Sequence, residues 1–239
     1  MKNLSKYTTV LLLTLLVSCK DEAVKPKVIY DTKKEKVAPK ADSTQIEIAD
    51  LPIQMRGTKY LIHPVGDLNV YEGRAKSSYG STTADRVSFT VSNTSEYEIT
   101  GYLRNLKFQQ IGSDSIKALT DKPVLIQTAT YLKSVSERTK QQIMVYTMAD
   151  DDTNKDGKLD INDIKTLYIS EISGNRLTKL SPDFQELIDW NLIESKNSLY
   201  FRTIEDTNKN GQFDKNDVLH YNFVDLSSKD WKVTMYNPI

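Results

Sequence analysis

The sequence predicts an all-β fold of antiparallel meanders, and two observations carry this prediction. Across residues 51–239, apolar residues recur mostly with a period of two, as in RVSFTV at 86–91, which is typical of strands buried on one face. The candidate strands are enriched in Val, Ile, Thr and Tyr, which suit a pleated, half-buried surface. Short polar stretches, such as SGN at 173–175, indicate hairpin turns between them.

The candidate strands are justified in chain order by this alternation. The early ones are 86–91, 97–102 and 106–111. A four-stranded meander follows at 124–132, 143–148, 167–172 and 176–180, and a second at 187–193, 199–203, 218–226 and 231–236. No window predicts a convincing helix, since 181–186 has a helix start but room for only one or two turns. We expect residues 51–123 to form divergent units of the same kind, or the whole domain to be a sandwich or an open stack of sheets.

Composition excludes several classes of function. The chain has 239 residues with 32 basic and 32 acidic side chains, so its formal charge is zero. A neutral chain has no long-range field to attract nucleic acid, and we expect no nucleic-acid partner. One cysteine cannot form an internal disulfide or a cysteine-based zinc site. Gly-x-Ser-x-Gly and His-Glu-x-x-His motifs do not occur, so no catalytic residues are predicted.

The first 18 residues are predicted to be a signal peptide. Lys2 and Lys6 precede an eight-residue apolar stretch at 10–17, which in a helix rises only about 12 Å and is too short to span a bilayer. The four residues LVSC at 16–19 resemble the lipobox of bacterial lipoproteins. That resemblance implies cleavage before Cys19, lipidation of its sulfur and anchoring in a membrane. Lys20 after the cysteine implies delivery to the outer membrane, on its periplasmic or cell-surface side.

Residues 19–50 are expected to be the lipidated cysteine and a flexible tether. Seven lysines before Ala41, with Pro26 and Pro39, leave little apolar surface to offset the entropy of ordering. A polybasic lipid-binding segment is the alternative, and the interspersed acidic residues argue against it. The β-rich domain is then predicted over 51–239, with an internal repeat at about 124–180 and 187–236.

The repeat carries two matching loops, DTNKDGKLDIND at 152–163 and DTNKNGQFDKND at 206–217, which are identical at eight of twelve positions. Each places oxygens at positions 1, 3, 5, 7, 9 and 12, the spacing that wraps six to eight oxygens around Ca²⁺. The predicted ligands are Asp152, Asn154, Asp156, Lys158, Asp160 and Asp163 in loop one, and Asp206, Asn208, Asn210, Gln212, Asp214 and Asp217 in loop two. Lys158 and Gln212 would contribute main-chain carbonyls, and position 9 would act through water.

Two further positions support this interpretation. Gly157 and Gly211 stand at position 6, where the chain turns too sharply for most side chains, and Leu159 and Phe213 at position 8 would anchor the loops in the core. The sequence therefore predicts two Ca²⁺ sites as the cofactors, with Mg²⁺ as the alternative. Asp/Asn/Gly clusters also form plain turns, but two in matching register favour metal binding.

Position 12 is Asp rather than the usual Glu of an EF-hand, and these loops resemble those of dockerins and other extracellular calcium modules. Strands rather than long helices flank them, so we expect strand, loop, one helical turn at 161–166 or 215–219, then strand. The segment LYISEISGNRLTKLSPD at 167–183 is similar to an outer hairpin of propeller blades in the periplasmic translocation protein family. Two blades cannot close a propeller, which needs about four.

These observations favour a lipid-anchored, calcium-stabilised extracytoplasmic β module that acts as a binding or scaffold protein of the cell envelope. Its partners would be the membrane, through the N-terminal lipid, and an envelope protein or glycan. One alternative is a surface glycan-binding lipoprotein, since 13 tyrosines with Trp190 and Trp231 could offer stacking platforms. Another is an envelope glycoside hydrolase, because the separation of paired acids is a three-dimensional property.

Overall fold

The computed structural model describes residues 26–30, 46–71 and 86–239, and their regular structure is mostly antiparallel β-sheet. The first strands are β1 (Glu47–Ala49), β2 (Ile53–Gln54), β3 (Tyr60–Asp67), β4 (Asn69–Tyr71), β5 (Arg86–Ser88), β6 (Ser92–Thr94), β7 (Glu98–Gln110) and β8 (Ile116–Ala118). Next come β9 (Leu125–Tyr131), helix α2 (Lys133–Thr139), β10 (Ile143–Ala149), β11 (Thr166–Glu171) and β12 (Thr178–Lys179). The last are β13 (Gln185–Ile193), the short 3-10 helix η2 (Glu194–Lys196), β14 (Ser198–Glu205), β15 (Val218–Asp225) and β16 (Val233–Met235).

The two predicted meanders are both present. Strands β9 to β12 pair in sequence order, and strands β13 to β16 form a separate four-stranded sheet in sequence order. Every pairing in them is antiparallel. The all-β fold class is thus confirmed, and each predicted copy of the repeat lies in one four-stranded meander.

Strand β7 joins the N-terminal strands to the first meander. Its first half pairs with β9 from Glu98↔Thr130 to Leu103↔Ile126, and its second half pairs with β3 up to Tyr60↔Gln110. The register shifts in both pairings, and such bulges bend a strand. The ten-stranded sheet therefore folds over itself at β7. We call β1, β2, β3, β8 and the second half of β7 layer one, β9–β12 layer two and β13–β16 layer three.

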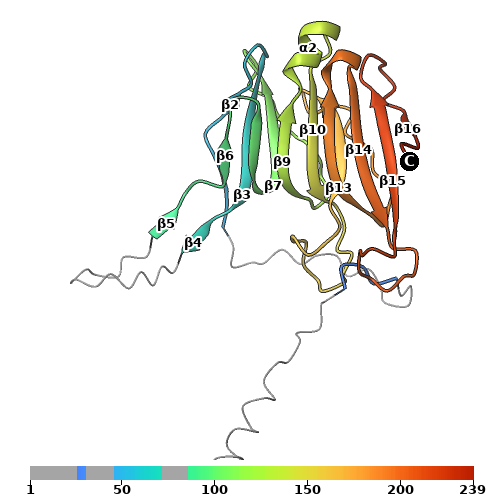
Figure 1. Cartoon of the computed structure of the whole chain (residues 1–239). Coiled ribbons are helices and arrows are strands. Elements are labelled where there is room, and N and C mark those ends of the chain that lie inside the picture. The colour runs from blue at the N-terminus through green and yellow to red at the C-terminus, as the bar shows by residue number, and fades with distance from the viewer. Residues whose placement is uncertain (1–25, 31–45, 72–85) are drawn as a thin grey trace, which may run out of the picture.

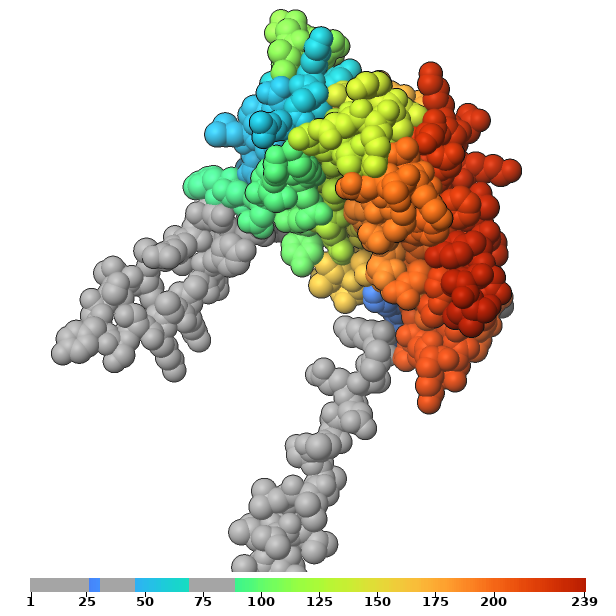
Figure 2. Space-filling view, turned by 45° about the horizontal axis from the view of Figure 1, so that its top comes forward, coloured from blue at the N-terminus to red at the C-terminus, as the bar shows by residue number. Residues whose placement is uncertain are grey.

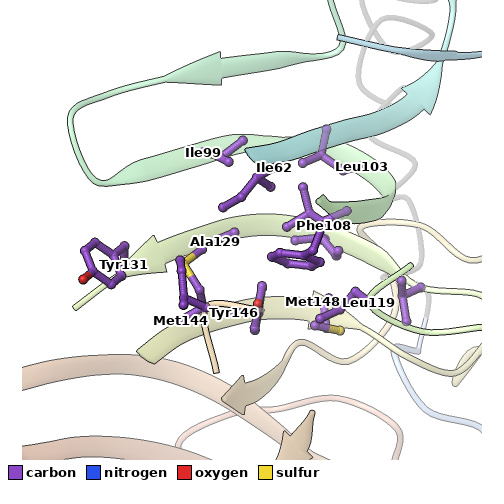
Figure 3. Packing of buried hydrophobic residues seen from close by; sticks show 14 of the residues in the cluster. Ile62, Ile99, Leu103, Phe108, Leu119, Ala129, Tyr131, Met144, Tyr146 and Met148 are labelled. Atoms are coloured by element: carbon purple, nitrogen blue, oxygen red, sulfur yellow. The ribbon is translucent and has the colours of Figure 1, made fainter. Parts of the chain in front are cut away.

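Two hydrophobic cores hold the three layers together. Between layers one and two lie buried residues that include Ile62, Leu103, Phe108, Met144 and Tyr146. Figure 3 shows Ile62, Ile99 and Leu103 on one side of this core and Met144, Tyr146 and Met148 on the other. The second core packs Val145, Leu167 and Ile169 of layer two against Leu199, Phe201 and Val224 of layer three. Each fully buried side chain of this size contributes about 1.5–3 kcal/mol.

The sequence of β10, IMVYTMA, explains why layer two is central. Met144, Tyr146 and Met148 face the first core, Ile143 and Val145 face the second, and all five are at most 1% exposed. A strand buried on both faces reads as a continuous apolar run rather than an alternation. The arrangement is an open stack of three layers, of which layers one and two belong to the ten-stranded sheet (Figure 1). An open stack of sheets is one of the architectures left open by the sequence.

Three expectations about local structure are wrong. A helix, α2, follows β9, with Val135 fully buried. It was missed because seven residues with one buried apolar position show no helical period. The helical turns expected at 161–166 and 215–219 are single reverse turns, closed by Asp163 N–H to Asp160 O and Asp217 N–H to Asp214 O. They cannot extend into helices because β11 and β15 begin at Thr166 and Val218.

The third correction concerns the tether assigned to 19–50. Strand β1 pairs with β3, so Glu47–Ala49 belong to layer one. The carboxylate of Asp50 accepts the backbone N–H groups of Val91 and Ser92. Residues 26–30 pack against the loops at 152–163 and 206–217 (Figure 2). The lysine-rich composition predicted a tether for these residues. That prediction failed because main-chain hydrogen bonds, rather than apolar side chains, hold most of them to the body. Within the described ranges, no helix is both long and apolar enough to cross a membrane.

Candidate metal centre

The two acidic loops lie at the same end of the molecule. Loop one (152–163) connects β10 to β11, and loop two (206–217) connects β14 to β15, so each joins the second and third strands of its meander. Figure 1 shows both loops below the sheets, with residues 26–30 between them. Equivalent positions in stacked meanders therefore bring together two motifs that are 54 residues apart in sequence.

Loop one is closed by hydrogen bonds from its own backbone to its acidic side chains. Asp152 accepts the N–H groups of Asp156 and Gly157 at 3.1 and 2.8 Å. Asp163, at position 12, accepts the N–H groups of Thr153 and Asp160 at 2.8 and 2.9 Å, which closes the loop from both sides.

Loop two repeats this pattern position by position. Asp206 accepts the N–H groups of Asn210 and Gly211 at 3.2 and 2.7 Å, and Asp217 accepts those of Thr207 and Asp214 at 3.2 and 2.8 Å. The side chains at positions 3, 5 and 9 likewise accept the N–H groups two residues on, in both loops. All the predicted side-chain ligands thus take part in one shared hydrogen-bond scheme.

The backbone of the two loops matches as well. Lys155 and Lys209 at position 4 have φ values of 55° and 56°, and Gly157 and Gly211 at position 6 have 84° and 81°. Residues with a Cβ rarely adopt this left-handed backbone conformation, so the expectation of a glycine-dependent turn at position 6 is confirmed.

The loops differ in how deeply they are buried. Leu159 is 5% exposed and packs with Leu125 and Ala149, so it anchors loop one as predicted, whereas Phe213 is only half-buried. Asp163 is fully buried, and burial raises the pKa of its carboxyl group above the usual range, although three backbone N–H groups oppose that shift. At the corresponding position Asp217 is half-buried.

The donor set of each loop fits a hard divalent cation. Carboxylate, amide and main-chain oxygens are the ligands that Ca²⁺ prefers, and each oxygen that accepts one N–H keeps a second lone pair. Within the described residues, no three acidic, His or Cys side chains converge closely enough to form a metal-ligand group. Ligation would therefore require the side chains of each loop to turn toward one common point.

Sequence reasoning missed residues 26–30 as neighbours of this centre. Ile29 N–H donates to Thr153 O at 2.9 Å, and Lys27 N–H donates to Gly211 O at 2.7 Å. The phenol of Tyr30 hydrogen-bonds to Asp206. Its burial and the Asp206 charge both raise the pKa of Tyr30, so the phenol stays protonated and donates. No sequence signal marks this contact, because it joins segments well over a hundred residues apart.

The chain has one cysteine, two histidines and two tryptophans, whose side chains suit lipidation, catalysis or stacking. Cys19 lies outside the described residues. His63 and His220 hydrogen-bond to Gln109 and Glu205 at 3.1 and 2.8 Å. Trp231 is 3% exposed beneath the Arg176 guanidinium, 4.4 Å from the ring centre, so Trp231 offers no exposed stacking platform to a glycan. Trp190 is half-buried against the second core.

Comparisons with known proteins add little to this description. No known protein family and no curated protein matches the chain. Among solved structures, the chain is similar to one assigned as TolB, from Agrobacterium tumefaciens, at 10% identity over 81% of each chain with a TM-score of 0.22.

Proposed function

We propose that this chain is a lipid-anchored, extracytoplasmic β module of the cell envelope whose two loops each hold a calcium ion. The observation that carries the proposal is the duplication of one loop with the same hydrogen-bond scheme at the same end of two stacked meanders. A plain turn needs no conserved set of oxygens at positions 1, 3, 5, 9 and 12. External calcium is abundant, so affinities of about 10⁻⁴ M would suffice.

Calcium would stiffen the end of the stack rather than open a groove. Each loop joins paired strands directly, so no helix pair is available to swing apart as in sensor proteins. A folded chain alone gathers the ligands, and binding therefore stabilises the native state. The module would then present a rigid surface to an envelope protein or glycan.

Melting of the full chain with and without calcium tests the metal sites. At a hundredfold excess over Kd, each ion adds about 2.7 kcal/mol and about 5–10 °C to the melting temperature. Chelation should remove this gain, and the double variant Asp152→Ala/Asp206→Ala should melt alike in both conditions. Asp114→Ala, an exposed aspartate between β7 and β8, is the control and should respond as the native chain does. If calcium leaves the melting temperature of metal-free native protein unchanged, the loops are plain turns that bind no metal.

Fatty-acid labelling tests the anchor. The lipobox ending at Cys19 predicts that cells expressing the native chain incorporate radiolabelled palmitate into it and retain it with membranes. Cys19→Ser should lose the label and remain uncleaved or leave the membrane fraction. Ser18→Ala keeps the small residue before the cysteine and should be labelled normally. Equal labelling of the native chain and Cys19→Ser would sink the lipoprotein assignment.

A glycan-binding role is a second candidate, supported by an aromatic cluster rather than by the tryptophans. Tyr200 and Phe223 stack with centroids 5.4 Å apart, and Tyr236 meets Tyr200 edge-on at 5.3 Å. These rings lie on the face of layer three that points away from the core, because Leu199, Phe201 and Val224 alternate with them inward. Flat aromatic surfaces suit the apolar faces of sugar rings.

Retardation in polysaccharide-containing native gels tests this second role. Tyr200→Ala with Tyr236→Ala should abolish any retardation, and Tyr102→Ala, which removes a 62% exposed ring from β7, should leave it intact. Equal mobility of the native chain in gels with and without a panel of envelope polysaccharides would exclude this candidate.

A further inference from the structure

Residues 26–30, which we call the strap, bridge the two loops. At loop two, the N–H groups of Lys27 and Val28 donate to Gly211 O at 2.7 and 3.3 Å. At loop one, Ile29 N–H donates to Thr153 O at 2.9 Å, and the Thr153 hydroxyl donates to Lys27 O at 2.8 Å. Three consecutive residues of the strap, Lys27 to Ile29, thus make main-chain hydrogen bonds to both loops at once.

The strap is seated rather than merely adjacent. Val28 is 2% exposed, and the Lys27 ammonium lies 3.0 Å from the Glu186 carboxylate. A Cβ built on Gly211 would lie 2.4 Å from Val28 O and 2.7 Å from the Pro26 Cβ, so the strap fits only against a glycine. The same position in loop one, Gly157, faces open space. The strap therefore distinguishes the two loops, although their own backbones match.

A continuous chain of hydrogen bonds runs from one loop to the other through the strap. Thr153 N–H donates to Asp163, the residue at position 12 of loop one, while the Thr153 carbonyl and hydroxyl hold the strap. Gly211 O holds the strap at the other side, while Gly211 N–H donates to Asp206 at position 1 of loop two. The Tyr30 phenol donates to that same Asp206. The strap is thus linked to a predicted ligand carboxylate of each loop, to Asp163 through Thr153 and to Asp206 through Gly211 and directly through Tyr30.

We propose that the strap couples the two loops, so that an ion in one raises the affinity of the other and both ions fasten residues 26–30 to the body. This inference rests on the calcium binding proposed above. An ion fixes the loop backbone around it, a fixed loop holds the strap in place, and the placed strap orders the second loop before its ion arrives. Coupling is reciprocal, so if calcium strengthens the binding of the strap to the body, the bound strap raises the affinity for calcium by the same factor.

The strap also sets how far the body stands from an anchor at Cys19. Pro26 is seven residues after Cys19, a reach of at most about 25 Å, whereas Glu47 in β1 is 28 residues after it, a reach of up to about 100 Å. A fastened strap would keep the loops near the membrane surface, and a released strap would let the body move much farther away.

Calorimetric titration of the full chain with calcium, in detergent, tests the coupling. The native chain should bind two ions cooperatively, the second at least about fivefold more tightly than an uncoupled site. Val28→Asn, outside both loops, should leave two independent sites. If Val28→Asn fails to fold, Tyr30→Phe, which removes only the phenol oxygen, is used in its place. Gly211→Ala should lose the coupling between the two loops. Gly157→Ala introduces the same backbone strain without a strap contact, so it should weaken calcium binding at loop one and retain the coupling.

Trypsin cleavage between Lys27 and Val28, followed by mass spectrometry, reports on the strap directly. Calcium should slow this cleavage at least tenfold in the native chain and leave it unchanged in Val28→Asn. Cleavage after Lys196 in η2, at the far end of layer three, corrects for global unfolding. If the native chain binds calcium but Val28→Asn binds it identically, and cleavage after Lys27 ignores calcium, the coupling is wrong and the calcium sites stand. If the native chain binds no calcium, the proposed function fails and the coupling fails with it.

Discussion

At the scale of single residues, position 5 distinguishes the two loops chemically. Asp156 supplies a carboxylate in loop one, whereas Asn210 supplies an amide oxygen in loop two. Loop one therefore offers four carboxylates and loop two offers three, and an amide brings no net charge to offset a divalent cation. Affinity in such loops follows ligand charge and rigidity. Loop one is also the more buried, since Asp163 is fully enclosed and Asp217 is not.

We therefore expect loop one to bind calcium several-fold more tightly than loop two. Calorimetry on Asp206→Ala, which leaves only loop one intact, and on Asp152→Ala, which leaves only loop two, measures each affinity alone. Adding Asn210→Asp to the Asp152→Ala chain should narrow the gap, because it restores the fourth carboxylate. A tighter site in the chain that keeps only loop two would show that loop rigidity outweighs charge count.

At the scale of elements, α2 ends on a residue with a side chain in a left-handed backbone conformation, which is energetically unfavourable. Lys140 caps the helix with a φ of 63°, in the left-handed region, and its N–H donates to Ser136 O at 3.0 Å. Glycine is the usual residue at this position because it has no Cβ to clash. The helix is short, so its C-terminal cap is a large part of its hydrogen bonding.

Lys140→Gly should raise the free energy of unfolding by about 0.5–1 kcal/mol, since relief of left-handed strain outweighs the greater entropy of the unfolded chain. Ser136→Gly, inside the same helix, should lower it by about 0.5 kcal/mol. Urea titration of both variants beside the native chain measures the two shifts. Destabilisation by both glycines would mean that the Lys140 side chain contributes more than its backbone costs.

At the scale of the whole molecule, the layers are linked by strands that belong to two cores. Strand β10 is buried on both faces, and β7 pairs with β3 and β9 at different points along its length. Losing one core would expose the face of β10 that lines it and weaken the strand for the other core. We therefore expect the three layers to unfold as one cooperative unit.

Phe201→Ala, in the core between layers two and three, should lower the stability by about 3–5 kcal/mol through the cavity it leaves. Tryptophan fluorescence follows layer three, where Trp190 and Trp231 both lie, and far-ultraviolet circular dichroism follows all three layers. Both signals should shift together in Phe201→Ala and stay unchanged in Phe89→Ala, whose ring is 72% exposed. A fluorescence transition that separates from the dichroism would show that layer three unfolds alone.

Local patterns were enough to predict the meanders and the loops. A period of two, turn residues and the 54-residue repeat act over a few neighbouring positions, and the strands from β9 to β16 follow from them. The loop geometry is local as well, because most hydrogen bonds within loop one join residues at most five positions apart, and those of Thr153, Asn154 and Ile164 span no more than eleven. Such features need no knowledge of the rest of the fold.

Tertiary contacts decided what no local pattern records. The bend of β7, the stacking of three layers and the seat of the strap depend on pairings between segments that are far apart in sequence. Residues 26–30 lie in a segment whose lysine-rich composition favoured a free tether, yet two folded loops present Gly211 and Thr153 side by side as hydrogen-bond partners. The sequence thus determined the local structure of each loop. Only packing of the meanders brought the loops and the strap together, because main-chain hydrogen bonds carry no sequence signature.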